Sequence, residues 1–533
     1  MKYTINEKYL EIPVNPHSTK KKILFYNIST GTRELVFEID TTVDSAEPEY
    51  FQYVNMERFN GCAMELLCDP AIDIKFNLTD EMRPEKRAVY EKYRPQVHFS
   101  AKRGWINDPN GLYYENGVYH MFFQHNPASR DWGNMHWGHA VSTDLVNWEQ
   151  KECALYPDEM GTMFSGSAII DKKNVTGLKT NENEVVLLYY TAAANNSIRS
   201  KGKKFTQCMA YSTDGGNTFV KYDKNPVVDF IEAENRDPKV IYSKELDAYI
   251  MALFLDGNRY NLFKSDNLID WKLMQALALP EDAECPDIYP LPTDGTGNKD
   301  ENGVKWIFSG ASDRYFVGEI KDGEYKVMQD AKRLHYGANS YAAQTFSGIE
   351  DGRTIRVAWD TMHIPNTYFN CSMCFPTEMS LKNINGEDFL CTMPVREIAK
   401  LYKTSEEYNN VEVKEGAKSE ISLDTDVYKA YDVEMVIKSK NDSIFKLKML
   451  GTEMVVDVRE NQIKVRDKSM PVCIKGDEIN LRIIADKNGF EIFAGYGEAF
   501  MCMGCLCDYS LKKFEIISEK SDIVVVSNNV RGM

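Results

Sequence analysis

Long apolar runs are absent from the sequence: the longest, near VVLLYYTAAA, is far shorter than a membrane-spanning segment. The first residues, MKYTINEKYLEIPVNPH, carry charges throughout and contain no apolar stretch of the kind found in secretory signal peptides. Basic residues are in deficit, with 63 Lys and Arg against 80 Asp and Glu and a formal net charge of −17. An acidic chain is a poor partner for nucleic acid phosphates or an anionic membrane. We therefore expect a cytoplasmic protein that binds neither nucleic acid nor membrane and takes an uncharged ligand.

The twelve cysteines do not form a recognisable metal or disulfide framework. Two groups are close in sequence, Cys371 with Cys374 and Cys502 with Cys505 and Cys507. Structural zinc sites use such spacings, but the intervening residues are typical of strands and no histidine pair follows. Disulfide frameworks belong mostly to small secreted domains, whereas this chain has 533 residues. We expect reduced thiols, no metal site and no cofactor.

The chain divides by pattern into four regions, within the range of domain counts that its length suggests. Residues 1–80 alternate short apolar strands with turns and predict a small all-β N-terminal domain. Residues 81–96 are charged and contain two prolines, as linkers do. Residues 97–390 continue as strands and show no long amphipathic helix, and residues 400–533 alternate in the way of a β-sandwich. In the last region, Asn488-Gly489 predicts a hairpin with a type I′ turn.

A weak repeat marks the region 97–390. An apolar strand is followed by a serine, an acidic residue in a turn and then an aromatic residue, in HAVSTDLVNW, MAYSTDGGNTF and LFKSDNLIDW. Four short strands per unit with a repeated turn is the pattern of propeller blades, although such turns are also common in other β proteins. The serines of the three copies are Ser142, Ser212 and Ser265.

Three segments carry carboxylates in positions suited to catalysis. In Trp105-Ile106-Asn107-Asp108-Pro109-Asn110-Gly111, the Asp-Pro and Asn-Gly pairs predict turns at the end of a strand, which would hold Asp108 at a chain reversal. In Arg236-Asp237-Pro238, the arginine can keep Asp237 ionised and donate to a substrate hydroxyl. Glu284 is followed by residues suited to burial, and a partly desolvated glutamate can act as a general acid. Each segment alone is also typical of an ordinary surface turn.

In this order, the segments resemble those of glycoside hydrolase family 32, the invertase, inulinase and levanase family. The resemblance runs from RPQVHFSAKRGWINDPNGLYYENGVYHMFFQHNP through WGNMHWGHAVSTDLVNWE, MFSGSA, RDPKV, ECPDIYPL and SYAAQTF. LRIIADKNGFEIF is similar to the final sandwich hairpin of the family. The N-terminal region is loosely similar to the extra β-domain of bacterial levanase-type enzymes. That region could hold a polymer, form an oligomer contact or only cover the propeller.

The resemblance implies an all-β fold in which a five-bladed β-propeller precedes a β-sandwich. It implies Asp108 as the catalytic nucleophile, Glu284 as the general acid/base and Asp237 as the carboxylate that stabilises the transition state. A retaining glycosidase needs two such carboxyl groups about 5–5.5 Å apart, and a closed propeller can bring these distant residues together. The positions that the resemblance places around the terminal fructose are Asn107, Gln124, Trp132, Phe164, Ser165 and Arg236.

Three departures from the family pattern lie away from these carboxylates. Ala101-Lys102 stands where prolines are common, Met373–Met379 replaces a conventional MSLPREL segment, and Asn339-Ser340 lacks the usual aspartate. They put the leaving-group side of the pocket in doubt and not the reaction. We expect Asp237 to stay ionised beside Arg236 and Glu284 to be protonated in the resting enzyme.

The expected function is that of a retaining exo-β-fructosidase. It would release terminal non-reducing β-D-fructofuranosyl residues from fructo-oligosaccharides, levan or inulin, and from sucrose. One alternative is a sucrose-6-phosphate hydrolase, for which the sequence offers only scattered basic residues, Arg314 and Lys332-Arg333. The other is a non-catalytic fructan-binding protein, which would be expected to lack Asp108 or Glu284. Linkage preference, chain-length preference and oligomeric state stay open, and a homodimer is compatible with the resemblance.

Overall fold

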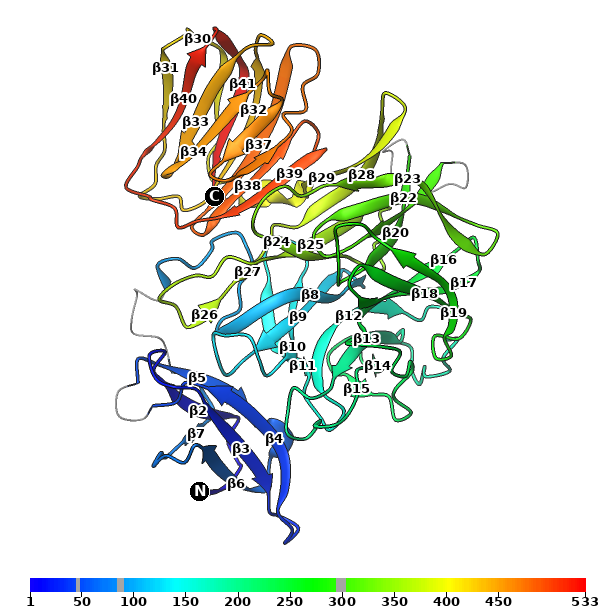
Figure 1. Ribbon diagram of the computed structural model, residues 1–533. Coiled ribbons are helices and arrows are strands. Elements are labelled where there is room, and N and C mark those ends of the chain that lie inside the picture. The colour runs from blue at the N-terminus through cyan, green and yellow to red at the C-terminus, as the bar shows by residue number, and fades with distance from the viewer. Residues whose placement is uncertain (45–47, 84–90, 294–302) are drawn as a thin grey trace.

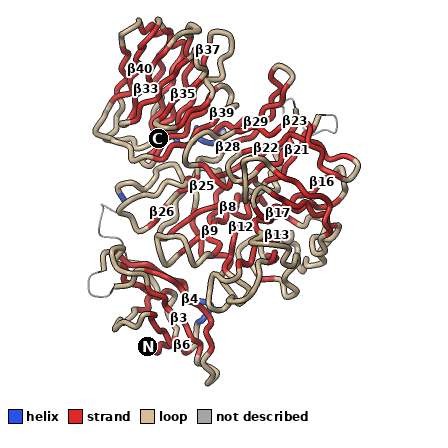
Figure 2. Tube along the Cα trace, in the orientation of Figure 1, coloured by secondary structure: helices blue, strands red, loops and turns tan. Residues whose placement is uncertain are grey.

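The structure is a computed structural model that describes residues 1–44, 48–83, 91–293 and 303–533. Strands dominate these ranges, and the helical segments in them are short 3-10 turns such as η1 (Glu57–Phe59) and η3 (Arg396–Leu401) (Figure 2). No helix in the described ranges is long and apolar enough to cross a membrane. Within the expected linker, residues 84–90 lie outside the described residues. The N-terminal sheets and the C-terminal sheets lie at opposite ends of the middle region (Figure 1).

Two small antiparallel sheets form the N-terminal region. Alternating residues such as Ile23, Phe25 and Ile39 are fully buried between them, as the period-2 pattern predicts. The same core includes Ala128 and Phe369 of the middle region, so the two regions share one apolar interface. The first sheet contains β1 (Lys2–Thr4), β6 (Ala63–Asp69), β3 (Lys21–Asn27) and β4 (Glu34–Thr41), and the second contains β5 (Tyr50–Asn55), β2 (Tyr9–Val14) and β7 (Asn77–Thr79).

The middle region is built from successive antiparallel meanders. Sheet one contains β8 (Gly104–Glu115), β9 (Val118–Asn126), β10 (His136–Ser142) and β11 (Glu149–Leu155), with β26 (Phe369–Asn370) parallel to β8. Sheet two contains β12 (Thr162–Ile170), β13 (Val186–Ala193), β14 (Thr206–Ser212) and β15 (Val220–Lys221). Sheet three contains β16 (Arg236–Ser243), β17 (Ala248–Asp256), β18 (Arg259–Ser265) and β19 (Lys272–Ala278).

Two further meanders complete this region. Sheet four contains β20 (Asp287–Pro292), β21 (Val304–Ser309), β22 (Arg314–Lys321) and β23 (Glu324–Arg333). Sheet five contains β24 (Ser340–Thr345), β25 (Thr354–Asp360), β28 (Thr377–Ile384) and β29 (Glu387–Pro394), with β27 (Ser372–Met373) beside β25. The first strands of the sheets contact one another in sequence, and β24 contacts β8, so they close a ring. Residues at the start of these strands therefore converge on one axis.

The repeated turn expected from the sequence occurs between the third and fourth strands of sheets one to three. β10, β14 and β18 end at Ser142, Ser212 and Ser265. In each copy the serine hydroxyl accepts a hydrogen bond from the backbone N–H two residues later, at 3.0, 3.3 and 3.2 Å. The serine ends the strand because its side chain offers the backbone a local hydrogen bond in place of a ladder bond.

The C-terminal region consists of two six-stranded sheets packed face to face (Figure 1). Their inner faces form one apolar core that includes Val433, Phe445 and Phe514. One sheet contains, in order, β30 (Glu406–Val413), β41 (Ile523–Gly532), β32 (Tyr431–Lys438), β37 (Glu478–Asp486), β38 (Gly489–Ala494) and β39 (Ala499–Gly504). The other contains β31 (Lys418–Ser422), β40 (Lys513–Lys520), β33 (Ile444–Met449), β34 (Thr452–Asp457), β35 (Gln462–Val465) and β36 (Lys468–Met470).

The hairpin predicted at Asn488-Gly489 exists, but its register and turn type differ from the prediction. Asp486 pairs with Gly489, so the two loop residues are Lys487 and Asn488, and neither has the positive φ of a type I′ turn. Gly489 is needed for another reason: a Cβ there would lie 2.6 Å from the carbonyl oxygen of Met503 on β39. The glycine therefore permits a close strand approach and does not form the turn.

Candidate active site

Asp108 lies inside β8 and not at a turn after a strand, so that expectation is wrong. The pairing of β8 with β9 shifts register between Ile106 and Pro109. Proline has no N–H to donate, and a bulge at this point redirects the neighbouring side chain. Ser165 donates to Oδ2 of Asp108 at 2.5 Å, and Asn107 donates to Oδ1 at 3.1 Å. These two donors fix the orientation of the half-buried Asp108 carboxylate.

Asp237 repeats this arrangement at the start of β16. The register of β16 shifts between Arg236 and Lys239, and Asp237 has a φ of 65°. Positive φ is costly for a residue with a side chain and is typical of functional positions. The backbone N–H of Asp237 donates to Oγ1 of Thr191 at 3.0 Å, and its Oδ2 accepts from the N–H of Cys285 at 3.0 Å. The carboxylate is 6% exposed.

Glu284 lies just before β20 and is held from two sides. Arg236 donates to Oε1 at 2.6 Å, and the hydroxyl of Tyr341 donates to Oε2 at 2.6 Å. Both Glu284 and Cys285 have positive φ, at 57° and 34°. The Glu284 side chain is 34% exposed, so a ligand can reach it from solvent.

The thiol of Cys285 joins the two aspartates. Its Sγ lies 3.5 Å from Oδ2 of Asp108 and 3.4 Å from Oδ2 of Asp237. Burial, followed by the charges of the carboxylates around it, raises the pKa of the Cys285 thiol well above its usual range. The group therefore stays protonated and can donate S–H to either carboxylate.

All the first strands of the middle region contribute to this centre. Register shifts in β8, β12, β16 and β24 coincide with the residues that meet there, and Glu284 precedes β20. Bulges next to active sites aim side chains that a regular pleat would direct elsewhere. The residues supplied by the successive sheets are Asp108, Ser165, Asp237, Glu284 and Tyr341.

The electrostatics of the aspartates differ from the expectation. Burial raises the pKa of Asp237 to about 7; Arg236 lowers it, and the carboxylates of Asp108 and Glu284 raise it further. Burial also raises the pKa of Asp108, although the hydrogen bonds from Ser165 and Asn107 lower it. Arg236 alone therefore does not keep Asp237 fully ionised in the free pocket. Closely spaced carboxyl groups titrate together, so a proton at this site belongs to the cluster of carboxyl groups and not to one residue.

Four further residues were expected around the sugar. One lies at the carboxylate centre, one is buried beside Asn110, and two form an aromatic pair. Trp105 donates from Nε1 to the side-chain oxygen of Asn107 at 2.8 Å, which turns the Asn107 amide nitrogen toward Asp108. Gln124 is 2% exposed and lies 3.0 Å from the side chain of Asn110. Trp132 is 50% exposed, and its ring meets that of Phe164 edge-on at 5.9 Å. Asn107 thus belongs to the carboxylate centre, and Trp132 and Phe164 form an aromatic pair that is partly open to solvent.

Sequence reasoning did not assign a role to Cys285 or Tyr341. Both lie in the quoted segments ECPDIYPL and SYAAQTF, but nothing local in those segments shows that they meet Glu284 or the aspartates.

Contacts with the sandwich explain the departure from the family pattern at Asn339. Its Oδ1 accepts from the N–H of Gly504 at 2.8 Å and its Nδ2 donates to Thr361 at 3.1 Å. Asn339 is thus engaged at the sandwich contact.

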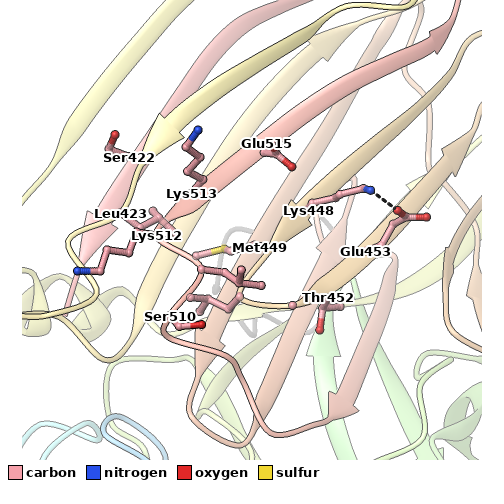
Figure 3. A pocket seen from close by; sticks show the side chains of 13 residues that line it. Ser422, Leu423, Lys448, Met449, Thr452, Glu453, Ser510, Lys512, Lys513 and Glu515 are labelled. Atoms are coloured by element: carbon pink, nitrogen blue, oxygen red, sulfur yellow. Dashed lines mark ion pairs between the residues drawn. The ribbon is translucent and has the colours of Figure 1, made fainter.

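An open groove on the sandwich lies apart from these carboxylates. It has a volume of about 830 Å³ and is lined by residues of the C-terminal region, among them Leu450, Leu511 and Lys512. Figure 3 shows the lining side chains, with Lys448 paired to Glu453 at 2.8 Å. None of the residues that the structure places along this groove comes from the ring of first strands.

Residues 98–394 match the model of the glycosyl hydrolases family 32 N-terminal domain. The chain belongs to glycosyl hydrolase family 32. It is 30% identical over 490 residues to a levanase of Bacillus subtilis (strain 168), covering 83% of this chain and 71% of that protein. It is 32% identical over 356 residues to an extracellular exo-inulinase of Aspergillus awamori, covering 57% of this chain and 65% of the relative.

Solved structures of family 32 proteins share the fold. The exo-inulinase from Aspergillus awamori aligns with a TM-score of 0.73 at 24% identity, over 83% of this chain and 98% of that one. Fructan 1-exohydrolase IIa from Cichorium intybus aligns with a TM-score of 0.69 at 21% identity, over 83% and 98%. The middle and C-terminal regions are thus the β-propeller and β-sandwich of this family, and the chain is a glycoside hydrolase.

Proposed function

We propose that the protein is a retaining exo-β-fructosidase that releases terminal non-reducing β-D-fructofuranosyl residues from fructo-oligosaccharides, levan or inulin, and from sucrose. The observation that carries this proposal is the meeting of Asp108, Asp237 and Glu284 around the Cys285 thiol and the Arg236 guanidinium. The substrates follow the relatives, which include a levanase, an exo-inulinase and a fructan β-fructosidase of Streptococcus mutans.

In the first step Asp108 attacks the anomeric carbon of the terminal fructose. Ser165 and Asn107 hold the carboxylate in a fixed orientation, so little reorganisation accompanies the attack. Glu284 gives its proton to the glycosidic oxygen as the bond to the leaving sugar breaks. The products of this step are a fructosyl–Asp108 ester and the shortened saccharide.

In the second step the ionised Glu284 takes a proton from water, and the resulting hydroxide displaces Asp108 from the fructosyl carbon. Asp237 accepts hydrogen bonds from sugar hydroxyls as positive charge develops on the ring, and Arg236 next to it donates to the same region. Arg236 and Tyr341 bind one oxygen each of Glu284, which keeps the carboxyl group aimed at the leaving oxygen in both steps.

We also propose that the five sheets of the middle region are the blades of a five-bladed propeller, supported by the closed ring of their first strands. We propose the domain limits 1–80 and 400–533, supported by a strand that ends at Thr79 and a strand that begins at Glu406, with 81–96 as the linker between the first two domains. The propeller extends slightly beyond residue 390, because β29 runs to Pro394. The structure joins none of the twelve cysteines in a disulfide, which supports our proposal of a reducing compartment such as the cytoplasm.

The basic residues considered for a sucrose-6-phosphate hydrolase are already engaged. Arg314 pairs with Glu281, Lys332 lies 2.9 Å from Glu387, and Arg333 donates to the carbonyl oxygen of His335 at 2.7 Å. A phosphate site needs donors that converge on an empty position. These contacts support unphosphorylated fructosides as the substrates.

A product assay tests the proposal. Sucrose, sucrose 6-phosphate, β-(2→1) and β-(2→6) fructo-oligosaccharides, inulin and levan are each incubated with the protein, and Asp108→Asn serves as the blank. We expect free fructose from the unphosphorylated substrates and a rate at least about 10³-fold lower for Asp108→Asn. Activity confined to sucrose 6-phosphate, or equal activity of the two proteins, would overturn the proposal.

A further inference from the structure

The two cysteine groups of the sequence meet at the junction between the propeller and the sandwich. Cys374 follows β27 of sheet five, and Cys502 lies on β39, which adjoins sheet five at the base of the sandwich (Figure 1). Their Sγ atoms are 3.9 Å apart although the residues are 128 positions apart in sequence. Glu491 on β38 pairs directly with Cys502 on β39, so the two side chains project from the same face of the sheet.

These three side chains have the spacing of a metal-binding set. One ligand atom from each of Cys374, Glu491 and Cys502 lies within 4.8 Å of the other two. Two thiolates bound tetrahedrally to zinc at about 2.3 Å are separated by about 3.8 Å. The observed sulfur–sulfur distance of 3.9 Å matches this geometry, whereas a disulfide would require the sulfurs to approach to about 2.05 Å.

One oxygen of the Glu491 carboxylate lacks a hydrogen-bond partner, which a bound cation would supply. Glu491 is 2% exposed and the cysteines are 4% exposed each, so water has little access. Oε1 of Glu491 accepts from the N–H of Phe375 at 2.8 Å, but its buried Oε2 has no hydrogen-bond partner. A buried carboxylate oxygen without a partner is costly, and a bound cation removes that cost.

His98 lies beside this set and contacts its carboxylate. Its Nε2 lies 3.3 Å from Oε1 of Glu491, and its Nδ1 lies 2.9 Å from Oδ2 of Asp486. Asp486 is itself fixed by the backbone N–H groups of Gln96 and Val97. Asp486 therefore fixes the His98 ring, and His98 in turn holds one oxygen of Glu491 in place.

We propose that Cys374, Cys502 and Glu491 bind one zinc ion that fastens the sandwich to the propeller. His98 lies outside this set and holds Glu491 from the other side through Nε2. Two thiolates and a carboxylate together favour zinc over the harder calcium and magnesium ions. Binding converts two thiols to thiolates and releases their protons to solvent. This site revises the expectation that no metal is bound, because the ligands come from both cysteine groups and not from either group alone.

The test uses the full-length protein with a tag that contains no histidines, expressed with zinc in the medium and purified without chelator. Metal content per chain is measured by plasma mass spectrometry for the wild type, Cys374→Ser, Glu491→Gln and Cys505→Ser. Cys505 is the matched control: it is 5% exposed in the same sandwich, and its Sγ contacts Thr452 at 3.5 Å outside the proposed set. We expect one zinc per chain in the wild type and in Cys505→Ser. We expect the zinc content per chain of Cys374→Ser and of Glu491→Gln to be lower by about tenfold or more.

Cobalt substitution gives a second measurement that needs no variant to fold. Wild-type protein refolded with Co²⁺ should show thiolate-to-metal charge-transfer absorption, and its intensity should correspond to two thiolate ligands per metal ion. Wild-type protein that holds less than about one tenth of an equivalent of zinc, both as purified and after refolding with zinc, overturns the proposal. Zinc content unchanged in a folded Cys374→Ser, or a cobalt complex without charge-transfer absorption, overturns it as well. These results do not depend on whether the protein hydrolyses fructosides.

Discussion

The hydroxyl of Tyr341, from the fifth sheet of the propeller, donates a hydrogen bond of 2.6 Å to Oε2 of Glu284, which precedes the fourth sheet. Burial and the Glu284 carboxylate raise the pKa of Tyr341 above its usual range, so the phenol remains a donor throughout the working pH. The other oxygen of Glu284 accepts from Arg236. A carboxyl group held at both oxygens keeps one orientation, as the proposed acid/base role of Glu284 requires.

Tyr341→Phe should lower kcat for sucrose by about tenfold and change KM little, because it removes a donor that positions the acid/base without removing the group itself. Steady-state kinetics on sucrose and on a fructo-oligosaccharide measure both constants. Tyr336→Phe is the control, since this half-buried tyrosine packs at the sandwich and has no contact with Glu284. A kcat within twofold of the wild type in Tyr341→Phe would show that Arg236 alone orients Glu284.

The buried carboxyl group of Asp237 should make the protein less stable as pH rises. Its pKa in the folded chain is about 7, above the ordinary value of a free aspartate near 4. Ionisation therefore opposes folding: the stabilising contribution is complete below about pH 4 and is lost as pH rises to about 7. We expect Asp237→Asn to raise Tm relative to the wild type at pH 8 and to have a smaller effect at pH 5, while hydrolysis is nearly abolished.

Thermal unfolding of both proteins at pH 5, 6, 7 and 8 checks this expectation. Asp266→Asn is the control, because the Asp266 side chain is 84% exposed and its loss should shift Tm equally little at every pH. If the Tm difference between Asp237→Asn and the wild type is the same at pH 5 and pH 8, Asp237 does not carry the excess proton of the cluster.

Much of the fold could be predicted from local patterns. The alternation in residues 1–80 gave the strands, and the turns after Ser142, Ser212 and Ser265 depend on hydrogen bonds within a few residues. The sequence identifies the aspartates of the Asp-Pro pairs as candidate catalytic residues, but it does not predict the backbone structure around them. A proline after an aspartate predicts a turn when the chain is considered alone. In the structure, β8 pairs with β9 and β16 pairs with β17 on both sides of these prolines, and each pairing leaves a bulge there.

The remaining features depend on contacts between distant residues. The register of the hairpin after β37 is set by the close approach of Gly489 to Met503 and by the amide of Asn488, which binds Asp360 and Ser372 in the propeller. The contact between Cys374 and Cys502 likewise exists only after the sandwich docks. No spacing rule within one segment contains that information, because it is created by tertiary packing.

The hydrogen bond from Ser165 to Asp108 should set the acidic limb of the pH profile. This bond lowers the pKa of the Asp108 carboxyl group, which burial otherwise raises. Ser165→Ala should therefore move the acidic limb of kcat/KM to higher pH and lower activity near pH 5 by about tenfold, with a smaller loss near pH 7. Ser167→Ala is the control on the same strand, since Ser167 donates to the carbonyl oxygen of Pro238 and not to a carboxylate. A uniform loss across the pH range in Ser165→Ala would assign Ser165 to sugar binding.

The N-terminal sheets should affect substrate binding through Asn134, two residues after Trp132. The Asn134 side chain accepts from the backbone N–H of Asp40 at 2.8 Å and donates to its carbonyl oxygen at 3.0 Å. Thr41 donates to the carbonyl oxygen of Ala128 in the same loop at 2.7 Å. β4 thus holds the loop that carries the exposed Trp132 ring.

Asn134→Gly removes these two hydrogen bonds and a third one within the middle region, from Nδ2 to Oδ1 of Asn126 at 3.1 Å. Glycine tolerates the φ of 46° at this position, so strain does not confuse the result. We expect KM for fructo-oligosaccharides to rise by about three- to tenfold with kcat nearly unchanged, because the loop loses order while the carboxylates stay in place. Asn385→Gly is the matched control, since Asn385 has a φ of 54° in the hairpin between β28 and β29 and lies far along the chain from this loop. Equal KM values for Asn134→Gly and Asn385→Gly would mean that the N-terminal sheets cover the propeller without ordering its substrate pocket.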